Sequence, residues 1–100
     1  MNRYRLASIP AVDSDIESAF AWYENERRGL GLEFLEEVRA AYDRIGASPQ
    51  QYQAVRSDIR RAFTRRFPYA VYFVVDDDKI VILAVIHASR DPAEWQHRTP

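Results

Sequence analysis

The sequence predicts a single α+β domain over residues 1–100. Two observations predict this class: apolar residues recur with a helical period in the first half of the chain, and strand-like apolar runs follow residue 49. A length of 100 residues with 47% hydrophobic content is sufficient for one hydrophobic core and not for two. We therefore expect an N-terminal strand, a hairpin of two helices and three further strands, with no interdomain linker.

The N-terminal part predicts a short strand followed by an amphipathic helix. Residues 3–9 alternate as a strand does, and Pro10 ends the alternation. Residues 11–28 place apolar side chains at helical spacing and acidic side chains on the other face. The helix start is defined only to within a few residues, because Pro10 suits a first turn while Ser14 with Glu17 matches a capping box.

A second helix is predicted over residues 32–45, after a glycine-containing connection. Gly46 suits the position just after its C-terminus, where the backbone often becomes left-handed. Because the connection is short, we expect the two helices to lie antiparallel. Trp22 and Tyr23 of the first helix are expected in the core and in helix contacts. The apolar stripe of the second helix consists of Leu35, Val38, Tyr42 and Ile45.

The second half of the chain predicts three strands after a polar loop. Residues 50–58 form the loop, and residues 59–65 form a basic strand. Residues 69–75 and 80–87 are apolar on both faces, and the acidic turn 76–79 joins them. Strands that are apolar on both faces belong in the middle of a sheet, so this pair should form its centre.

One face of this central pair has no predicted cover. The helix hairpin covers one face, while the other stays apolar through residues such as Tyr72 and Val74 or their neighbours of opposite parity. Since a small monomer rarely exposes a large apolar patch, we expect a groove or a partner-binding surface there. The alternative is that loops and the C-terminal tail cover this face.

Charge is distributed unevenly along a chain whose formal net charge is only −1. Residues 13–44 contain nine acids and four bases, net −5, whereas residues 56–67 contain five arginines and one acid, net +4. Such arginines can bind phosphates or carboxylates beside an aromatic ring that stacks on a base, or they can protect an edge strand from pairing with other sheets. Strand alternation divides them between two sides: Arg61 and Arg65 with Phe63 on one, Arg60 and Arg66 on the other.

Composition excludes several classes of site. The chain has no cysteine, and its two histidines, His87 and His97, are a poor metal signature by themselves. No glycine-rich phosphate loop, serine nucleophile motif or carboxylate metal cluster is present, so we expect no metal and no cofactor. The N-terminus lacks a signal-peptide core and the apolar run 80–86 is too short to span a bilayer. We therefore expect a cytoplasmic protein without membrane contact.

The end of the last strand collects polar residues that a buried sheet does not require. His87 has a side chain suited to acid–base catalysis, yet it shares the strand parity of Leu83 and Val85, and a lone histidine at a strand end is usually structural. Asp91 precedes a proline and suits the start of a turn, and Trp95 should pack the tail onto the sheet.

Three motifs carry a family resemblance: WYENERRGLGLEF at 22–34, Arg-Phe-Pro-Tyr at 66–69, and His87, Arg90-Asp91-Pro92 and Trp95 after the last strand. Together with the order of the elements, they resemble the RelE/ParE superfamily of toxins from type II toxin–antitoxin systems, specifically its ParE-like plasmid-stabilisation branch. The resemblance implies two helices on one curved, mainly antiparallel sheet, whose last three strands form a meander. It also implies an antitoxin partner that covers an apolar groove.

The superfamily includes RelE-like ribonucleases, which cut messenger RNA on the ribosome, and ParE-like proteins, which inhibit DNA gyrase and are not hydrolases. RelE-like enzymes have an arginine directly after the tyrosine of the central strand, where this chain has Ala70 after Tyr69. The C-terminal aromatic position holds Trp95 or Gln96, neither of which donates a proton usefully. The ribonuclease set is therefore incomplete, and it would consist of Arg61, Arg65, His87 and Arg90.

The sequence thus favours a ParE-like toxin that binds a protein target, with DNA gyrase implied by the resemblance and a cognate antitoxin as its inhibitor. Two alternatives are a metal-independent, RelE-like endoribonuclease acting on ribosome-bound messenger RNA, and a weakly toxic or silent member that only binds antitoxin. A homodimer and a toxin–antitoxin hetero-oligomer are both compatible with the sequence. The residues expected at partner contacts are Arg60, Arg61, Arg65, Tyr69, Tyr72, Arg90 and Trp95.

Overall fold

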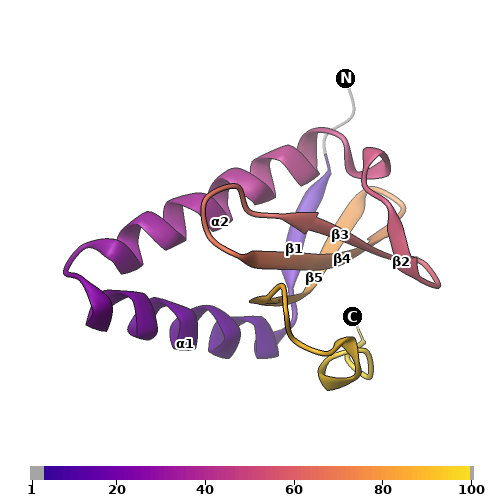
Figure 1. Ribbon diagram of the computed structural model, residues 1–100. Coiled ribbons are helices and arrows are strands. Elements are labelled where there is room, and N and C mark those ends of the chain that lie inside the picture. Colours follow the sequence, from indigo (N-terminus) through magenta and orange to yellow (C-terminus); the bar gives the residue numbers. More distant parts are fainter. Residues whose placement is uncertain (1–3, 100) are drawn as a thin grey trace.

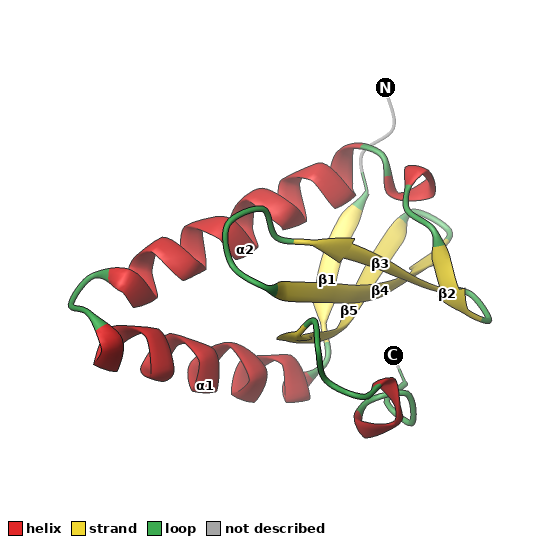
Figure 2. Cartoon of the chain, viewed as in Figure 1, coloured by secondary structure: helices red, strands yellow, loops and turns green. Residues whose placement is uncertain are grey.

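The computed structural model describes residues 4–99, which form two α-helices and five β-strands (Figures 1 and 2). Two short 3₁₀ helices, Pro49–Gln51 and Pro92–Glu94, follow the second helix and the last strand. In chain order the elements are β1 (Arg5–Ser8), α1 (Pro10–Glu26), α2 (Leu30–Ala47), β2 (Ala54–Arg56), β3 (Ile59–Phe63), β4 (Tyr69–Asp76) and β5 (Lys79–His87). The strand predicted over residues 3–9 corresponds to β1, and its first residue lies outside the described residues.

The five strands form one sheet in the order β1-β5-β4-β3-β2. β1 pairs with β5 in parallel, and the other neighbours are antiparallel, so that β2 to β5 form a meander. Both helices pack on one face of the sheet, and the chain after β5 turns onto the other face (Figure 1). This confirms the predicted α+β fold of a helix hairpin on a mainly antiparallel sheet.

The segment 50–58, predicted as a loop, contains the outermost strand β2. Its three residues are all exposed, so no apolar alternation marked them as a strand. β2 pairs with β3 through a register shift between Ala54 and Arg56. β3 is therefore an interior strand, and the interpretation of its arginines as protection of a sheet edge is wrong.

Both helices differ from their predicted ends. α1 begins at Pro10, because the missing N–H of proline needs no partner in a first turn, and Ser14 lies inside the helix instead of capping it. α2 continues through Gly46, so the predicted stop at this glycine is wrong. Gly46 instead allows α2 to approach β1, since a Cβ atom there would lie 3.3 Å from Cδ1 of Leu6.

A carboxylate of α1 stabilises the connection between the helices. Glu24 accepts hydrogen bonds from the backbone N–H groups of Gly29 and Gly31, each at 3.0 Å. These N–H groups lie at the N-terminus of α2, where the helix dipole favours a negative charge. Gly29 has a left-handed φ of 89°, and the backbone of Gly31 lies against the ring of Phe20. The turn therefore requires a glycine at both positions.

The core between the hairpin and the sheet contains a cluster of aromatic side chains. The rings of Tyr23, Phe34, Phe67 and Tyr69 contact one another with centroid separations of 4.7–6.0 Å. Aromatic pairs of this kind contribute roughly 0.5–1.5 kcal/mol beyond the burial of their surface. Tyr23 comes from α1 and Phe34 from α2, so the cluster joins both helices to the start of β4.

A β-bulge in β5 changes the face that its residues occupy. The register between β4 and β5 shifts after Tyr72 and leaves Leu83 as the additional residue of β5. Leu83 then faces away from the helices, while Val85 packs in the core beneath them. His87 follows Val85 on the helix side, where its ring lies 5.6 Å from that of Tyr69. The prediction that these three residues share one face is therefore wrong for Leu83 and right for Val85 and His87.

Replacing Gly31 with alanine should destabilise the fold, because the new Cβ would lie 2.8 Å from two ring carbons of Phe20. We expect the free energy of unfolding in urea to fall by about 1–3 kcal/mol. Gly46→Ala is the control, since its Cβ would meet only the flexible end of Leu6 and helix propensity favours alanine by about 1 kcal/mol. Equal losses in the two variants would contradict this account.

The hydroxyl of Tyr42 on α2 is buried and has no hydrogen-bond partner among residues 4–99. Burial, together with Asp13 and Asp15, raises the pKa of Tyr42 to about 12. This folded-state pKa lies above the ordinary value near 10, so the unfolded chain ionises at a lower pH than the folded chain. The contribution of the neutral hydroxyl to the free energy of unfolding is therefore fully present below about pH 10 and is lost as the pH rises toward 12. In urea denaturation across this pH range, Tyr42→Phe should remove most of that loss, which reaches roughly 2–3 kcal/mol near pH 12. An unchanged profile would show that this hydroxyl is not the titrating group.

Candidate partner-binding site

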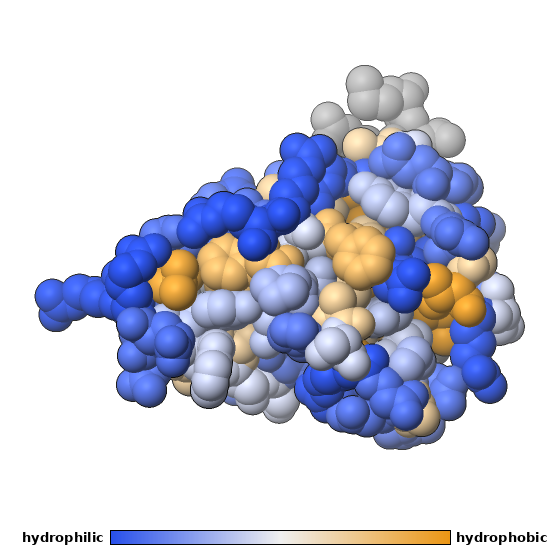
Figure 3. Space-filling model, in the orientation of Figure 1, coloured by the Kyte–Doolittle hydropathy of each residue, from blue (hydrophilic) through white to orange (hydrophobic). Residues whose placement is uncertain are grey.

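The C-terminal segment, residues 92–99, covers the sheet face opposite the helices. Its Trp95 is 1% exposed and lies on the ring of Tyr72, itself 2% exposed, with centroids 4.0 Å apart. The tail therefore covers much of this apolar face, as the alternative expected, while a hollow remains between the tail and β2. On the side viewed in Figure 3, apolar residues form a row left of centre and separate smaller patches farther right. Tyr72 and Trp95, expected at partner contacts, are almost fully buried here, although both line the hollow on this face.

A largely buried ion pair anchors the C-terminal segment to α1. Arg98 donates to both carboxylate oxygens of Asp15, at 2.7 and 3.2 Å, and to the backbone carbonyl of Leu83 at 3.0 Å. The same carboxylate accepts the backbone N–H of Val85 at 3.0 Å. β1 pairs with β5 only as far as Ile82, so the ion pair satisfies backbone groups that the sheet leaves without a strand partner.

A groove of about 330 Å³ lies between α1 and the end of the sheet where β4 begins and β5 ends. Side chains from successive turns of α1 form one wall, and residues at the start of β4 and after β5 form the other. We call it the Trp22 groove. Its principal lining residues are Ser14, Ser18 and Trp22 of α1, Tyr69 of β4, Val85 of β5, and Arg90.

The walls of the Trp22 groove combine an indole, a phenol and a guanidinium. Trp22 is 63% exposed, and Arg90 forms an ion pair with Glu94 that holds its guanidinium at the rim. Burial raises the pKa of Tyr69, while the charge of Arg90 acts in the opposite direction, so the hydroxyl is protonated at neutral pH and can donate a hydrogen bond. Trp, Tyr and Arg are the residue types that most often dominate binding energy at protein interfaces. The groove therefore has the chemistry of a protein-binding surface.

The four residues of the ribonuclease alternative do not meet at one site. Arg61 lies on the face away from the helices, whereas His87 lies on the helix side against Tyr69. Arg90 lines the Trp22 groove, and Arg65 follows β3 in a loop held to α2 through its backbone. RNA cleavage needs an acid, a base and cations within hydrogen-bonding reach of one phosphodiester. The sheet separates the groups that would have to cooperate.

Two of the expected site residues are engaged in local hydrogen bonds. Nδ1 of His87 accepts the backbone N–H of Ser89 at 3.1 Å and lies 2.8 Å from its hydroxyl. Arg60 donates to the backbone carbonyls of Gln50 and Tyr52, at 3.4 and 2.5 Å. Both side chains therefore fix neighbouring chain segments: the turn after β5 and the approach to β2.

Trp22 is the candidate that sequence reasoning assigned to the core. Its neighbour Tyr23 does pack in the core, but Trp22 lies on the adjacent side of α1. Positions 14, 18 and 22 share that side, and the first two are serines. In the sequence, the two small polar residues on the same side of the helix as the tryptophan were the feature that could have indicated a groove there.

Residues 10–92 match the family model described as ParE toxin of type II toxin-antitoxin system, parDE. The chain belongs to the ParE toxin family. A solved structure titled chromosomal ParDE TA system from P. aeruginosa has the same fold, with a TM-score of 0.74 at 16% sequence identity. The similarity covers 85% of this chain and 96% of that chain. A comparison with curated protein sequences gives no significant match.

The range matched by the ParE toxin family includes every lining residue of the Trp22 groove and ends at Pro92. Trp95 and Arg98 of the C-terminal segment lie beyond it. Neither helix of the described chain is long and apolar enough to cross a membrane. Among residues 4–99, His, Asp and Glu side chains form no group of three or more that could hold a metal ion.

Replacing Arg98 with glutamine should release the C-terminal segment, because Asp15, 8% exposed, would lose its charged partner. We expect about 2–3 kcal/mol of destabilisation in urea, below the usual range for a fully buried pair because Arg98 is 18% exposed. In a Trp22→Phe background, the emission of Trp95 should shift to longer wavelength.

Arg5→Gln is the matched control for this change. Arg5 pairs with Asp78 on the surface, where both side chains are mostly exposed, so its loss should change stability by less than about 0.5 kcal/mol. Unchanged Trp95 emission in Arg98→Gln would mean that the ion pair does not anchor the segment.

Proposed function

We propose that this ParE-family chain is the toxin of a type II toxin–antitoxin module and arrests growth by binding a protein target. DNA gyrase is the proposed target, because ParE-like proteins are known for inhibiting it. A cognate antitoxin is the proposed inhibitor. The observation that carries the proposal is the family match over residues 10–92, which spans both helices and the five-stranded sheet apart from β1.

The Trp22 groove is the proposed contact with the target. Its exposed indole would lose most of its remaining contact with water in an interface, a gain on the order of 3 kcal/mol. The Tyr69 hydroxyl and the Arg90 guanidinium lie on the opposite wall, where they can select hydrogen-bond acceptors on the partner. Two of the residues expected at partner contacts, Tyr69 and Arg90, thus join Trp22 in one concave surface.

The arrangement of the basic residues supports binding over RNA cleavage. Arg61 and His87 occupy opposite faces of the sheet, and the imidazole of His87 already bonds to Ser89. A RelE-like mechanism would need these groups on one substrate phosphate. The silent-member alternative makes a different prediction, since such a chain would leave growth unaffected when expressed without a partner.

Trp22→Ala should weaken the proposed activity with little effect on folding, because the side chain is already 63% exposed. We expect at least a tenfold higher concentration for half-maximal inhibition of gyrase supercoiling, together with weaker growth arrest on induction. Leu32→Ala is the control, since Leu32 is 61% exposed on α2 and does not line the groove. It should retain the parent activity.

Three outcomes separate the hypotheses. Equal losses in Trp22→Ala and Leu32→Ala would remove the groove from the target contact. Uninhibited supercoiling combined with cleavage of translated messenger RNA would favour the RelE-like alternative. Normal growth on induction of the parent chain, verified as folded by circular dichroism, would overturn the toxin proposal.

A further inference from the structure

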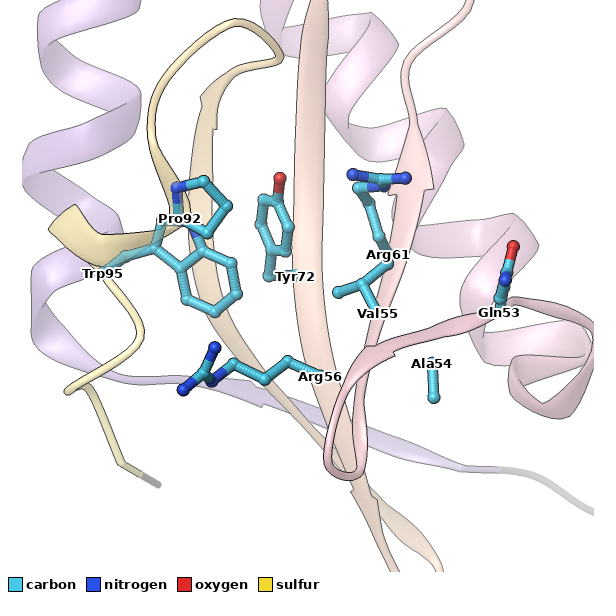
Figure 4. Close-up of a pocket in the computed structure, with 8 residues that line it drawn as sticks. All are labelled: Gln53, Ala54, Val55, Arg56, Arg61, Tyr72, Pro92 and Trp95. Carbon is cyan, nitrogen blue, oxygen red and sulfur yellow. The ribbon is translucent and has the colours of Figure 1, made fainter.

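The sheet face away from the helices carries a second hollow, of about 400 Å³, between β2 and the C-terminal segment (Figure 4). Two arginines contribute to it: Arg61 of β3 stands beside Tyr72, and Arg56 at the end of β2 extends toward Trp95. Val55 adds an apolar side chain to the β2 wall. We call this hollow the arginine pocket.

Neither arginine of the pocket has an acidic partner among residues 4–99. Five other arginines in this part of the chain each pair with an aspartate or a glutamate. Arg61 instead stacks on Phe63, with its guanidinium carbon 4.8 Å from the ring centroid. Stacking orients the guanidinium plane and leaves its N–H groups available to an acceptor. The pocket therefore offers two cationic donors that the fold itself does not use.

The strand beside the arginine pocket offers backbone partners as well. β2 is the outermost strand of the sheet, and all three of its residues are exposed. An extended peptide can pair with such an edge and point alternate side chains to one face. The register shift in β2 limits this pairing to a few residues. A short peptide segment suits the site better than a long one.

We propose that the arginine pocket binds the carboxylate side chains of a short, extended acidic segment of a partner protein, paired along β2. Charge favours this occupant over RNA. Residues 56–67, with five arginines and one aspartate, carry +4, whereas residues 13–44 on the helix hairpin, with four bases and nine acids, carry −5. A long polyanion would extend onto the acidic hairpin, while a segment confined to β2 and β3 meets only the basic region.

Within the proposed function this partner is the antitoxin, and that identification alone rests on the proposed function. The arginine pocket and the Trp22 groove lie on opposite faces of the sheet. An antitoxin segment in the arginine pocket would therefore leave the groove geometrically accessible. Inhibition of the toxin would then require additional antitoxin contacts, with the pocket contributing affinity.

The test uses two pentapeptides, acetyl-Asp-Val-Asp-Val-Asp-amide and the same sequence with Asn in place of Asp. Alternation places the three acidic side chains on one face of an extended peptide. Each peptide is titrated into the full ¹⁵N-labelled chain. We expect the acidic peptide to shift the amide signals of residues 53–56 and the Nε signals of Arg56 and Arg61 in a saturable manner. The neutral peptide should leave these signals unchanged.

Substitutions identify the groups that bind the acidic peptide. The double variant Arg56→Gln/Arg61→Gln should raise its apparent Kd at least tenfold. Arg39→Gln is the control, because Arg39 is an exposed arginine of α2 that forms no ion pair with the rest of residues 4–99. It should retain the parent affinity. Raising the salt concentration from 50 to 500 mM should weaken binding to the parent much more than to the double variant.

Equal shifts with both peptides, or shifts confined to the Trp22 groove, would overturn the proposal. If a uridine hexanucleotide shifts the pocket signals and the acidic peptide does not, the pocket is a nucleic-acid site and the proposal also fails. Neither gyrase nor an antitoxin enters the titration. A negative result here therefore leaves the proposed function standing, and an absence of growth arrest leaves the pocket chemistry standing.

Discussion

Burial of the β4–β5 pair on both faces is the constraint on which the rest of the structure depends. Almost every side chain of these two strands between residues 70 and 86 is buried, apart from the turn that joins them. The helix hairpin covers one face, so the chain after β5 has to return across the other with Trp95. Each large apolar side chain left uncovered would cost about 1.5–3 kcal/mol. The ion pair of Asp15 and Arg98 joins the two covers at the free edge of β5.

The Trp22 groove and the arginine pocket lie where these covers end. The Trp22 groove lies beside α1, where the helix diverges from the end of the sheet, and the arginine pocket lies where the C-terminal segment stops short of β2. One presents an exposed indole and a phenol, and the other presents two guanidinium groups that form no ion pair within residues 4–99. Because they face opposite sides of the sheet, a partner at one need not displace a partner at the other.

Much of the fold was predictable because it depends on local periodicity. The 3.6-residue pattern located both helices, and strands apolar on both faces located the sheet centre. Alternation also placed Arg61 correctly on the side opposite Arg60. Prediction failed where the local pattern gives no signal. The bulge at Leu83 breaks the alternation of β5, and β2 has no buried residue that would mark it as a strand. Trp22 was misplaced because a tryptophan beside a core tyrosine is ordinarily buried as well.

The sequence by itself determined the type and order of the main elements and the family, because both depend on patterns that are continuous along the chain. Only the tertiary structure decided which strand is the sheet edge, what covers the second face and which charged groups share a site. The reason is that these features depend on contacts between residues far apart in the chain. Asp15 and Arg98 lie 83 positions apart, and their hydrogen bonds anchor the tail over the sheet. Likewise, the sheet separates Arg61 from His87, although both lie in the basic C-terminal half of the chain.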